Sequence, residues 1–315
     1  MSMLYLTEQD VRDLLPMPVC IELMQTAFQR LAAGEAINQP RRRLILPTGS
    51  VLHYMAASDG EYYGAKIYAT NPRYGAHFLF LLYRAADAEP LAIVEANHLG
   101  QIRTGAASGL ATKFMAPADA HTLAIIGSGF QARTQLEAMR AVGKFDEVRV
   151  WSRDPAKRAA FAAETNARAV DTAEAAVRGA QIVVTATNAK EPVISSEWIE
   201  PGTHLNVMGS NRANRREVPA ELVRRADLIV VDSIEQARME SGDLVMALEE
   251  KDWSSPRIVE LKDIVAVGES ARTTPNEITL FKSIGLAVED VIAAAFVYER
   301  ARARRASITP VAAHS

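Results

Sequence analysis

The sequence predicts an α/β fold in two parts: a doubly wound Rossmann domain and a separate α+β domain. From residue 121 onward, short apolar strands alternate with helices, which is typical of a doubly wound parallel sheet. Residues 41–95 instead carry short apolar runs separated by Gly, Pro, Asp and Asn, which predicts an antiparallel or mixed sheet. The expected Rossmann strands are 122–126, 147–151, 181–186, 203–208 and 228–232. The expected strands of the other sheet are 44–46, 51–55, 63–68, 78–83 and 91–94.

The length of 315 residues is more than one hydrophobic core usually holds, so we expect two domains, or one large domain with an insertion. We expect the α+β domain over residues 1–118 and the Rossmann domain over 119–286. The amphipathic segment 287–304 predicts a helix that returns to the first domain. Residues 305–315 lack periodicity and are expected to form a mobile tail.

Composition excludes several classes of protein. A hydrophobic content of 49% and a net charge of −3 indicate a soluble globular protein and give no sign of a nucleic-acid partner. No segment has the pattern of a signal peptide or a membrane span, so we expect a cytoplasmic protein without a membrane partner. The lone Cys20 lies in an apolar helical pattern and is interpreted as a core residue, and the six histidines show no metal-binding spacing. We therefore predict no metal.

Local signals place three helices in the first half of the chain. Thr7 and Asp10 have the spacing of a capping box, which predicts a helix that ends before Pro16. A second helix is expected at about 18–33 and should stop at Gly34. Residues 101–115 are rich in Ala, Gly and Ser, which predicts a closely packed helix.

The motif Gly127-Ser-Gly129-Phe-Gln-Ala132 is the most specific functional signal. It follows the apolar run 123–126 and precedes a helical pattern, which is the context a dinucleotide fingerprint requires. Gly127 permits the tight turn, Gly129 lets a pyrophosphate approach the backbone, and Ala132 lets helix and strand pack closely. The N–H groups at the helix start then face the phosphates.

The end of the second Rossmann strand indicates which nucleotide binds. NAD-binding folds usually place Asp or Glu there to hold the ribose 2′-hydroxyl, whereas this chain has Ser152 and Arg153. The planar guanidinium of Arg153 suits a 2′-phosphate. We therefore favour NADP, with NAD possible. In the alternative, Arg153 is a solvated loop charge and Asp154 contacts an NAD ribose.

Several segments, in this order, make the chain resemble the ornithine cyclodeaminase and mu-crystallin family from about residue 5 to 300. They are Gly64-Ala-Lys66, Gln101-Ile-Arg-Thr-Gly-Ala-Ala-Ser108, the 127–132 fingerprint, Asn206-Val-Met-Gly-Ser-Asn211 with Arg216-Glu217, and Ile278-Thr-Leu-Phe-Lys-Ser-Ile-Gly285 with Glu289-Asp290. The resemblance implies a substrate-binding and dimer-forming domain beside the Rossmann domain. It also implies redox chemistry at the α-carbon of an amino acid or its imine.

The resemblance assigns roles to individual residues. It makes Lys66 the proton donor and acceptor, Arg103 the carboxylate anchor and Arg42 the second anchor, with a register uncertain by one within 41–43. These roles make chemical sense, because a carboxylate suits bidentate arginine and a partly desolvated lysine exchanges a proton near neutrality. In the simpler interpretations, these residues are surface charges. The cofactor contacts expected on the same basis are Thr104, Gly127, Gly129, Phe130, Gln131, Ser152, Arg153, Thr187, Met208 and Ser283.

Two departures from the family pattern bear on the reaction. Cyclodeaminases carry a catalytic Asp where this chain has Asn211, and a Glu where it has His53. Asn cannot act as a general base, so we expect reduction of an α-imino acid or a cyclic ketimine such as pyrroline- or piperideine-2-carboxylate. The alternatives are an ornithine cyclodeaminase, an alanine-type dehydrogenase, or a small-ligand binding protein that holds NADPH. The apolar sheet of the first domain needs a cover, and we expect a homodimer.

Overall fold

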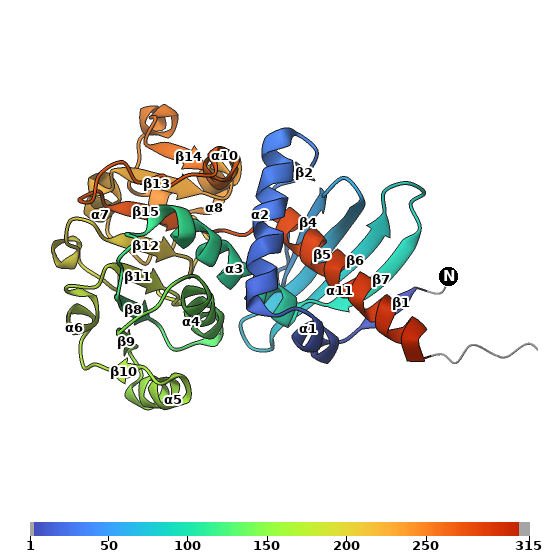
Figure 1. Ribbon diagram of the computed structural model, residues 1–315, viewed down its shortest axis with the longest axis horizontal. Helices are drawn as coiled ribbons and strands as arrows, with labels where there is room; N and C mark the ends of the chain where they lie inside the picture. Colours follow the sequence, from blue (N-terminus) through green and yellow to red (C-terminus); the bar gives the residue numbers. More distant parts are fainter. Residues whose placement is uncertain (1–2, 309–315) are drawn as a thin grey trace, which may run out of the picture. The chain divides into compact units, whose positions relative to one another are not determined.

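The computed structural model describes residues 3–308. The chain forms two compact units (Figure 1). The first unit comprises the chain up to Arg103 together with the segment from Leu286 onward, and the second unit runs from Thr104 to Gly285. The first unit is α+β and the second is a Rossmann unit with an all-parallel sheet, in agreement with the predicted fold class.

A seven-stranded sheet forms the scaffold of the first unit. Its order is β1-β7-β6-β5-β4-β2, with β3 also paired to β4; all pairs are antiparallel except β1 with β7. The predicted mixed sheet is therefore confirmed. The strands are β1 (Leu4–Leu6), β2 (Ile37–Asn38), β3 (Arg42–Ile45), β4 (Val51–Ser58), β5 (Tyr62–Asn71), β6 (Gly75–Arg84) and β7 (Pro90–Glu95).

The helices of the first unit are α1 (Glu8–Leu14), α2 (Met17–Ala33), α11 (Ala287–Ile308) and the first turns of α3 (Asn97–Met115). Thr7 and Asp10 form the predicted capping box, and α2 ends at Gly34, whose φ of 74° only glycine adopts readily. α11 packs against α2, β4 and β5, and Figure 1 shows it lying across one face of the sheet. α11 continues four residues past the predicted end at 304, and residues 309–315 of the expected tail lie outside the described residues.

The two faces of this sheet differ because side chains alternate along each strand. His53, Met55, Lys66 and Phe80 are buried on the inner face. The outer face is apolar yet open: its side chains include Leu44, Tyr54 and Leu79, which are 54%, 48% and 42% exposed.

The second unit has an eight-stranded parallel sheet of order β10-β9-β8-β11-β12-β15-β13-β14. All five predicted Rossmann strands are present. The sequence pattern did not predict β15, which lies between β12 and β13, because Thr279 and Lys282 make this buried four-residue strand less apolar than the others. The strands are β8 (Thr122–Ile126), β9 (Glu147–Trp151), β10 (Arg168–Ala169), β11 (Ile182–Thr185), β12 (His204–Val207), β13 (Leu228–Val231), β14 (Ile258–Glu260) and β15 (Thr279–Lys282).

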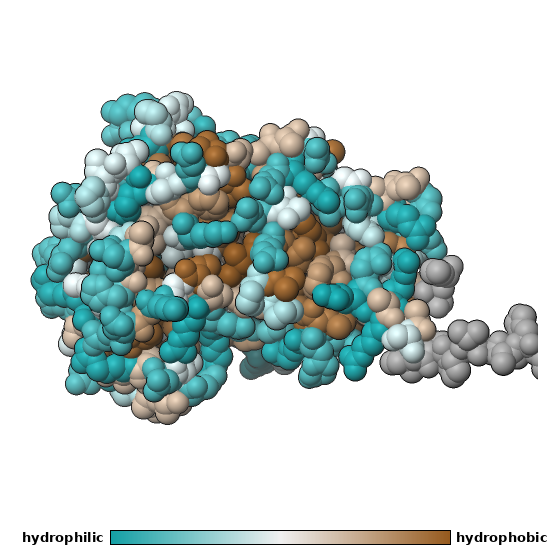
Figure 2. All heavy atoms as spheres, in the orientation of Figure 1, coloured by the Kyte–Doolittle hydropathy of each residue, from teal (hydrophilic) through white to brown (hydrophobic). Residues whose placement is uncertain are grey.

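The remaining helices connect these strands. α3 begins at Asn97, four residues earlier than predicted, and packs as closely as expected: a Cβ at Gly105 would lie 2.5 Å from the carbonyl oxygen of Thr134. Polar side chains cover most of the face of this unit visible in Figure 2. The helices are α4 (Phe130–Val142), α5 (Pro155–Thr165), α6 (Ala173–Val177), α7 (Ala220–Arg225), α8 (Ile234–Glu240), α9 (Gly242–Val245) and α10 (Leu261–Val267), with 3-10 turns η1 (Ser196–Trp198) and η2 (Glu250–Ser254). Within residues 3–308, no helix is long and apolar enough to cross a bilayer.

Candidate functional site

The glycine motif lies at the turn from β8 to α4, as its sequence predicts. Gly127 has a φ of 125°, and a Cβ there would lie 2.4 Å from the carbonyl oxygen of Ala186, so only glycine fits. Gly129 is the N-cap of α4, and a Cβ built on it would meet no heavy atom within 4 Å. The tight turn and the open space before the helix N-terminus together fit a pyrophosphate.

A cavity of about 550 Å³ opens at this turn. It lies beyond the carboxyl ends of β8, β9, β11 and β12, where the strand order reverses around β8 and where doubly wound sheets bind nucleotides. Eight of the expected cofactor contacts line it: Gly127, Gly129, Phe130, Gln131, Ser152, Arg153, Thr187 and Met208. Thr104 and Ser283 are not among its lining residues. Three further residues that the sequence did not predict also line it: Lys157, Asn188 and Gly209.

At the end of β9, Arg153 and Asp154 are the alternative contacts for the nucleotide, and they differ in their hydrogen bonds. Asp154 is the N-cap of α5, and its carboxylate accepts a hydrogen bond from the backbone N–H of Lys157 at 3.1 Å. This bond lowers the pKa of Asp154. Arg153 is exposed at the rim of the cavity, and the buried hydroxyl of Ser152 accepts a hydrogen bond from Ser128 at 2.9 Å. Asp154 thus has a helix-capping role, and both Asp154 and Arg153 line the cavity.

The loops after β11 and β12 are joined by the buried carboxylate of Glu217. Its Oε1 accepts the backbone N–H and the hydroxyl of Thr187 at 2.6 and 2.7 Å. Its Oε2 accepts the backbone N–H of Gly209 at 2.6 Å and the hydroxyl of Thr185 at 2.9 Å. Because Thr187 and Gly209 line the cavity, Glu217 sets the shape of its wall.

A second buried carboxylate supports this wall. Asp243 Oδ1 accepts the backbone N–H of Glu217 at 2.6 Å, and its Oδ2 lies 2.9 Å from Nζ of the fully buried Lys282. Lys282 also donates to the carbonyl oxygen of Ser210 at 2.8 Å. Neither Asp243 nor Lys282 was assigned a role from the sequence, although Lys282 lies within the family motif 278–285.

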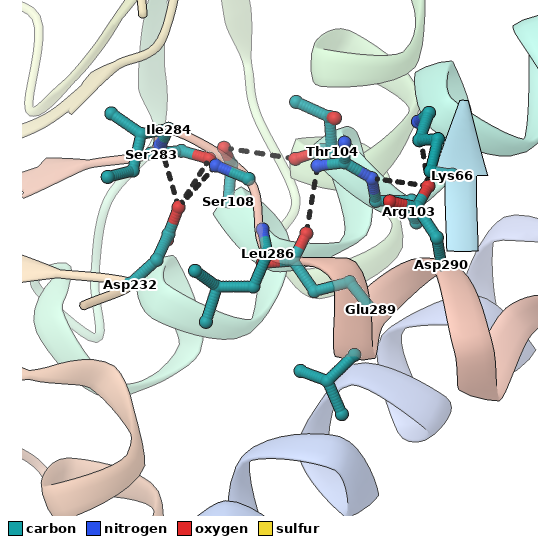
Figure 3. Close-up of polar contacts among 12 residues, drawn as sticks. Lys66, Arg103, Thr104, Ser108, Asp232, Ser283, Ile284, Leu286, Glu289 and Asp290 are labelled. Carbon is teal, nitrogen blue, oxygen red and sulfur yellow. Dashed lines mark hydrogen bonds and ion pairs between the residues drawn. The ribbon is translucent and has the colours of Figure 1, made fainter. Parts of the chain in front are cut away.

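Ser283 and Asn211 also belong to the second unit. Ser283 forms part of a turn held by Asp232 Oδ2, which accepts the N–H groups of Ile284 and Gly285 at 2.6 Å each and the Ser283 hydroxyl at 3.4 Å (Figure 3). Asn211 is half-buried in the loop after β12.

The first unit brings together the charged residues expected to bind substrate. Lys66 is 3% exposed in the middle of β5, and its Nζ lies 2.8 Å from Oδ1 of Asp290 on α11. Arg103 on α3 donates from Nε to the same oxygen at 3.2 Å and from Nη1 to Glu289 Oε2 at 2.9 Å (Figure 3). The fit is close, because a Cβ at Gly100 would lie 2.6 Å from Nζ of Lys66.

The charges and the burial of this cluster shift the pKa values of its members. Burial is the main cause that lowers the pKa of Lys66 from 10.5 to about 8; Arg103 and Arg41 act in the same direction and Asp290 opposes them. Burial alone would raise the pKa of Asp290, yet Arg103 and Lys66 bring it below its ordinary value. The cluster therefore holds an ammonium beside a carboxylate in a buried site, with a pKa suited to proton transfer near neutrality.

Strand register distinguishes the arginines that precede β4. Arg42 pairs with Tyr54, and Tyr54 pairs with Ile67, so these three side chains share one face of the sheet. Because Ile67 follows Lys66 along β5, that face is the one opposite Lys66, and Arg42 is exposed on it. Arg41 is 3% exposed, its Nη2 lies 3.7 Å from Sδ of Met55, and its charge acts on Lys66.

His53 contributes to an aromatic wall. Its ring stacks on Tyr68 at 4.3 Å with an interplanar angle of 2°, and Tyr68 stacks on Phe78 at 4.7 Å. His53 Nε2 also lies 3.0 Å from the hydroxyl oxygen of Thr70. These contacts hold the His53 ring on the inner face of the sheet.

The fold and the two clusters define a class of protein: a Rossmann dinucleotide-binding unit combined with an α+β unit that carries a buried Lys–Asp–Arg cluster. The chain belongs to the ornithine cyclodeaminase/mu-crystallin family, whose model matches residues 1–305. It is 35% identical over 322 residues to a Delta(1)-pyrroline-2-carboxylate reductase of Bacillus cereus, covering 95% of this chain and 97% of the relative.

Two solved structures share the whole fold. One is the Delta(1)-pyrroline-2-carboxylate reductase of Thermococcus litoralis in complex with NADH and L-proline, with a TM-score of 0.89, 34% identity and coverage of 96% of this chain and 98% of that one. The other is an archaeal alanine dehydrogenase dimer with bound NAD, with a TM-score of 0.90, 30% identity and coverage of 97% and 98%.

Proposed function

We propose that the chain is an NAD(P)H-dependent imino-acid reductase that converts an α-imino acid or a cyclic ketimine, such as a pyrroline- or piperideine-2-carboxylate, to the amino acid. The observation that carries this proposal is the buried Lys66 ammonium, grouped with Arg103 and Arg41 in a chain that also has a dinucleotide cradle. The reductase and dehydrogenase names of the similar proteins support it.

The residues of the first unit divide the chemistry between them. Arg103 and Arg41 supply the positive charge that binds the substrate carboxylate. Lys66 gives its proton to the imine nitrogen, which makes the adjacent carbon accept an electron pair. When bound, the reduced nicotinamide supplies a hydride to that carbon. The C=N double bond becomes a C–N single bond while one C–H and one N–H bond form. The nicotinamide would be oxidised, and Lys66 regains a proton from solvent.

For the second unit, we propose NADP as the preferred nucleotide. Gly127 and Gly129 leave room for the pyrophosphate, and Arg153 and Lys157 at the rim of the cavity supply positive charge for a 2′-phosphate. Asp154 also lines the cavity, but its Oδ1 caps the N-terminus of α5, so we assign the nucleotide contact to the two cations. A lower KM for NADH than for NADPH would contradict this preference.

Asn211 favours reduction over cyclodeamination, because cyclodeamination needs a base that an amide does not provide. The test supplies a panel of imino acids with NADPH and of amino acids with NADP, and follows the absorbance of the reduced nicotinamide. We expect reduction of imino acids and no ammonia from ornithine. Robust ornithine-dependent ammonia release would establish a cyclodeaminase instead. NADPH binding without turnover of any substrate would establish a binding protein.

We also propose a homodimer that covers the outer face of the first unit's sheet. Leu44, Tyr54 and Leu79 expose about half of their surface there, and an apolar sheet face of this kind needs a partner. The similar archaeal alanine dehydrogenase forms a dimer, which supports the proposal. Sedimentation of a monomer at micromolar concentration would contradict it.

A further inference from the structure

Asp290 connects two cations that the proposed function uses. Its Oδ1 lies 2.8 Å from Nζ of Lys66 and 3.2 Å from Nε of Arg103, and Figure 3 shows both contacts meeting at this one oxygen. The three side chains come from β5, α3 and α11, and Asp290 is 0% exposed. A carboxylate in such a place has lost its hydration, so it is held there by its contacts with the cations.

We propose that Asp290 is a positioning residue that fixes the ammonium of Lys66 and keeps it protonated for transfer to the imine nitrogen. This inference rests on the proposed function and adds to it the group that controls the proton. Asp290 acts through Lys66.

The geometry leaves the ammonium little freedom. Nζ is bound by Asp290 on one side and faces the backbone of α3 at Gly100, where a Cβ would lie only 2.6 Å away. The strands beside β5 place Met55 and Phe80 opposite Lys66, and the ring of Phe78 lies 5.6 Å from Nζ. With apolar neighbours on the strands, the contact with Asp290 determines where the proton donor sits.

The charges around Lys66 show why the carboxylate is needed. Burial lowers the pKa of Lys66, and so do the charges of Arg103 from α3 and Arg41 from the segment before β3. Asp290 from α11 raises the pKa of Lys66, both by its charge and by its hydrogen bond, and so stabilises the ammonium. Glu289, the neighbouring carboxylate, contacts Arg103 instead.

The test compares Asp290→Asn with Glu289→Gln. Reduction needs protonated Lys66, so kcat/KM for the imino acid falls as pH rises through the pKa near 8. Loss of the Asp290 charge lowers that pKa. In Asp290→Asn, the falling limb of the plot of kcat/KM against pH therefore moves to lower pH by about 1–3 units. The original protein and Asp290→Asn are measured with the same imino acid, so protonation of the substrate itself affects both pH profiles equally and does not contribute to the difference between them.

Glu289→Gln is the matched control, because it removes the same charge from the adjacent position of α11. Since Glu289 Oε2 holds Arg103 at 2.9 Å, this variant is expected to raise KM for the imino acid and to leave the limb in place. Asp290→Glu keeps the charge but displaces it, so its limb should lie between those of the original protein and Asp290→Asn. If Asp290→Asn does not fold, Asp290→Glu carries the test, and an unmoved limb in it overturns the proposal.

A direct titration separates this inference from the proposed function. The pKa of Lys66 is measured by NMR on protein with isotope-labelled lysine, with the signal assigned by its loss in Lys66→Arg. This value does not depend on turnover, so an enzyme inactive on every imine would refute the function and still leave Asp290 testable. A Lys66 pKa unchanged in Asp290→Asn, or shifted equally in Glu289→Gln, would overturn the role of Asp290.

Discussion

Glu217 gives the sharpest test of how the second unit maintains its nucleotide cavity. Its buried carboxylate accepts four hydrogen bonds at 2.6–2.9 Å, two on each oxygen, from Thr185, Thr187 and Gly209. Each oxygen receives one backbone N–H and one hydroxyl. Glu217→Gln keeps one acceptor oxygen and replaces the other with an NH₂ group, which is itself a donor.

The cost follows from which donors can adapt. A threonine hydroxyl can rotate and accept from the new NH₂ group, but a backbone N–H cannot, so in either orientation of the amide one buried N–H loses its acceptor. Such an unpaired group costs about 1–3 kcal/mol. For a protein of this size, that corresponds to a decrease in Tm of roughly 2–12 °C.

The assay measures Tm by thermal unfolding and KM for each substrate by initial rates. KM for NADPH should rise, since Thr187 and Gly209 line the cavity, and KM for the imino acid should not change. Glu221→Gln, at an exposed position on α7, is the control and should leave all three values unaltered. A Glu217→Gln protein with unchanged Tm and unchanged KM for NADPH would refute the role assigned to this carboxylate.

Three further predictions concern the two proposed binding sites and the dimer. Lys66→Ala should reduce kcat about 10²–10⁴-fold, with little change in NADPH affinity, because it removes the general acid; a residual rate near that of the original protein would exclude Lys66 as the proton donor. Arg153→Ala should weaken NADPH binding about 10- to 100-fold and leave NADH nearly unchanged, because a charge-assisted contact contributes roughly 1.5–3 kcal/mol; equal loss for both nucleotides, measured by fluorescence titration, would show a structural role only. Leu44→Glu on the outer sheet face should convert the dimer to monomer in sedimentation, and an unaltered dimer would place the interface elsewhere.

Local patterns in the sequence determined the elements of the fold. The capping box at Thr7, the stop at Gly34 and the turn at Gly127 are set by residues within a few positions, so sequence alone locates them. Runs such as 122–126 are apolar at every position because both faces of a parallel strand are buried. The fingerprint and the family motifs likewise pointed to residues that line one cavity, and to Lys66 and Arg103, which both contact Asp290.

Tertiary structure decided which charged residues act together. Side chains alternate along a strand, so the pairing of Arg42 with Tyr54 places Arg42 on the face opposite Lys66. The preceding Arg41 is buried, and its charge lowers the pKa of Lys66. The sequence left the register uncertain by one residue, and such a shift moves a side chain to the other face, so the sequence could not distinguish Arg41 from Arg42. Asp290 contacts Lys66 although the two residues are 224 positions apart in the sequence, and Glu217 contacts Thr187, which is 30 positions away. No periodicity encodes such pairs, because they exist only once α11 has packed on the first sheet and the loops after β11 and β12 have come together.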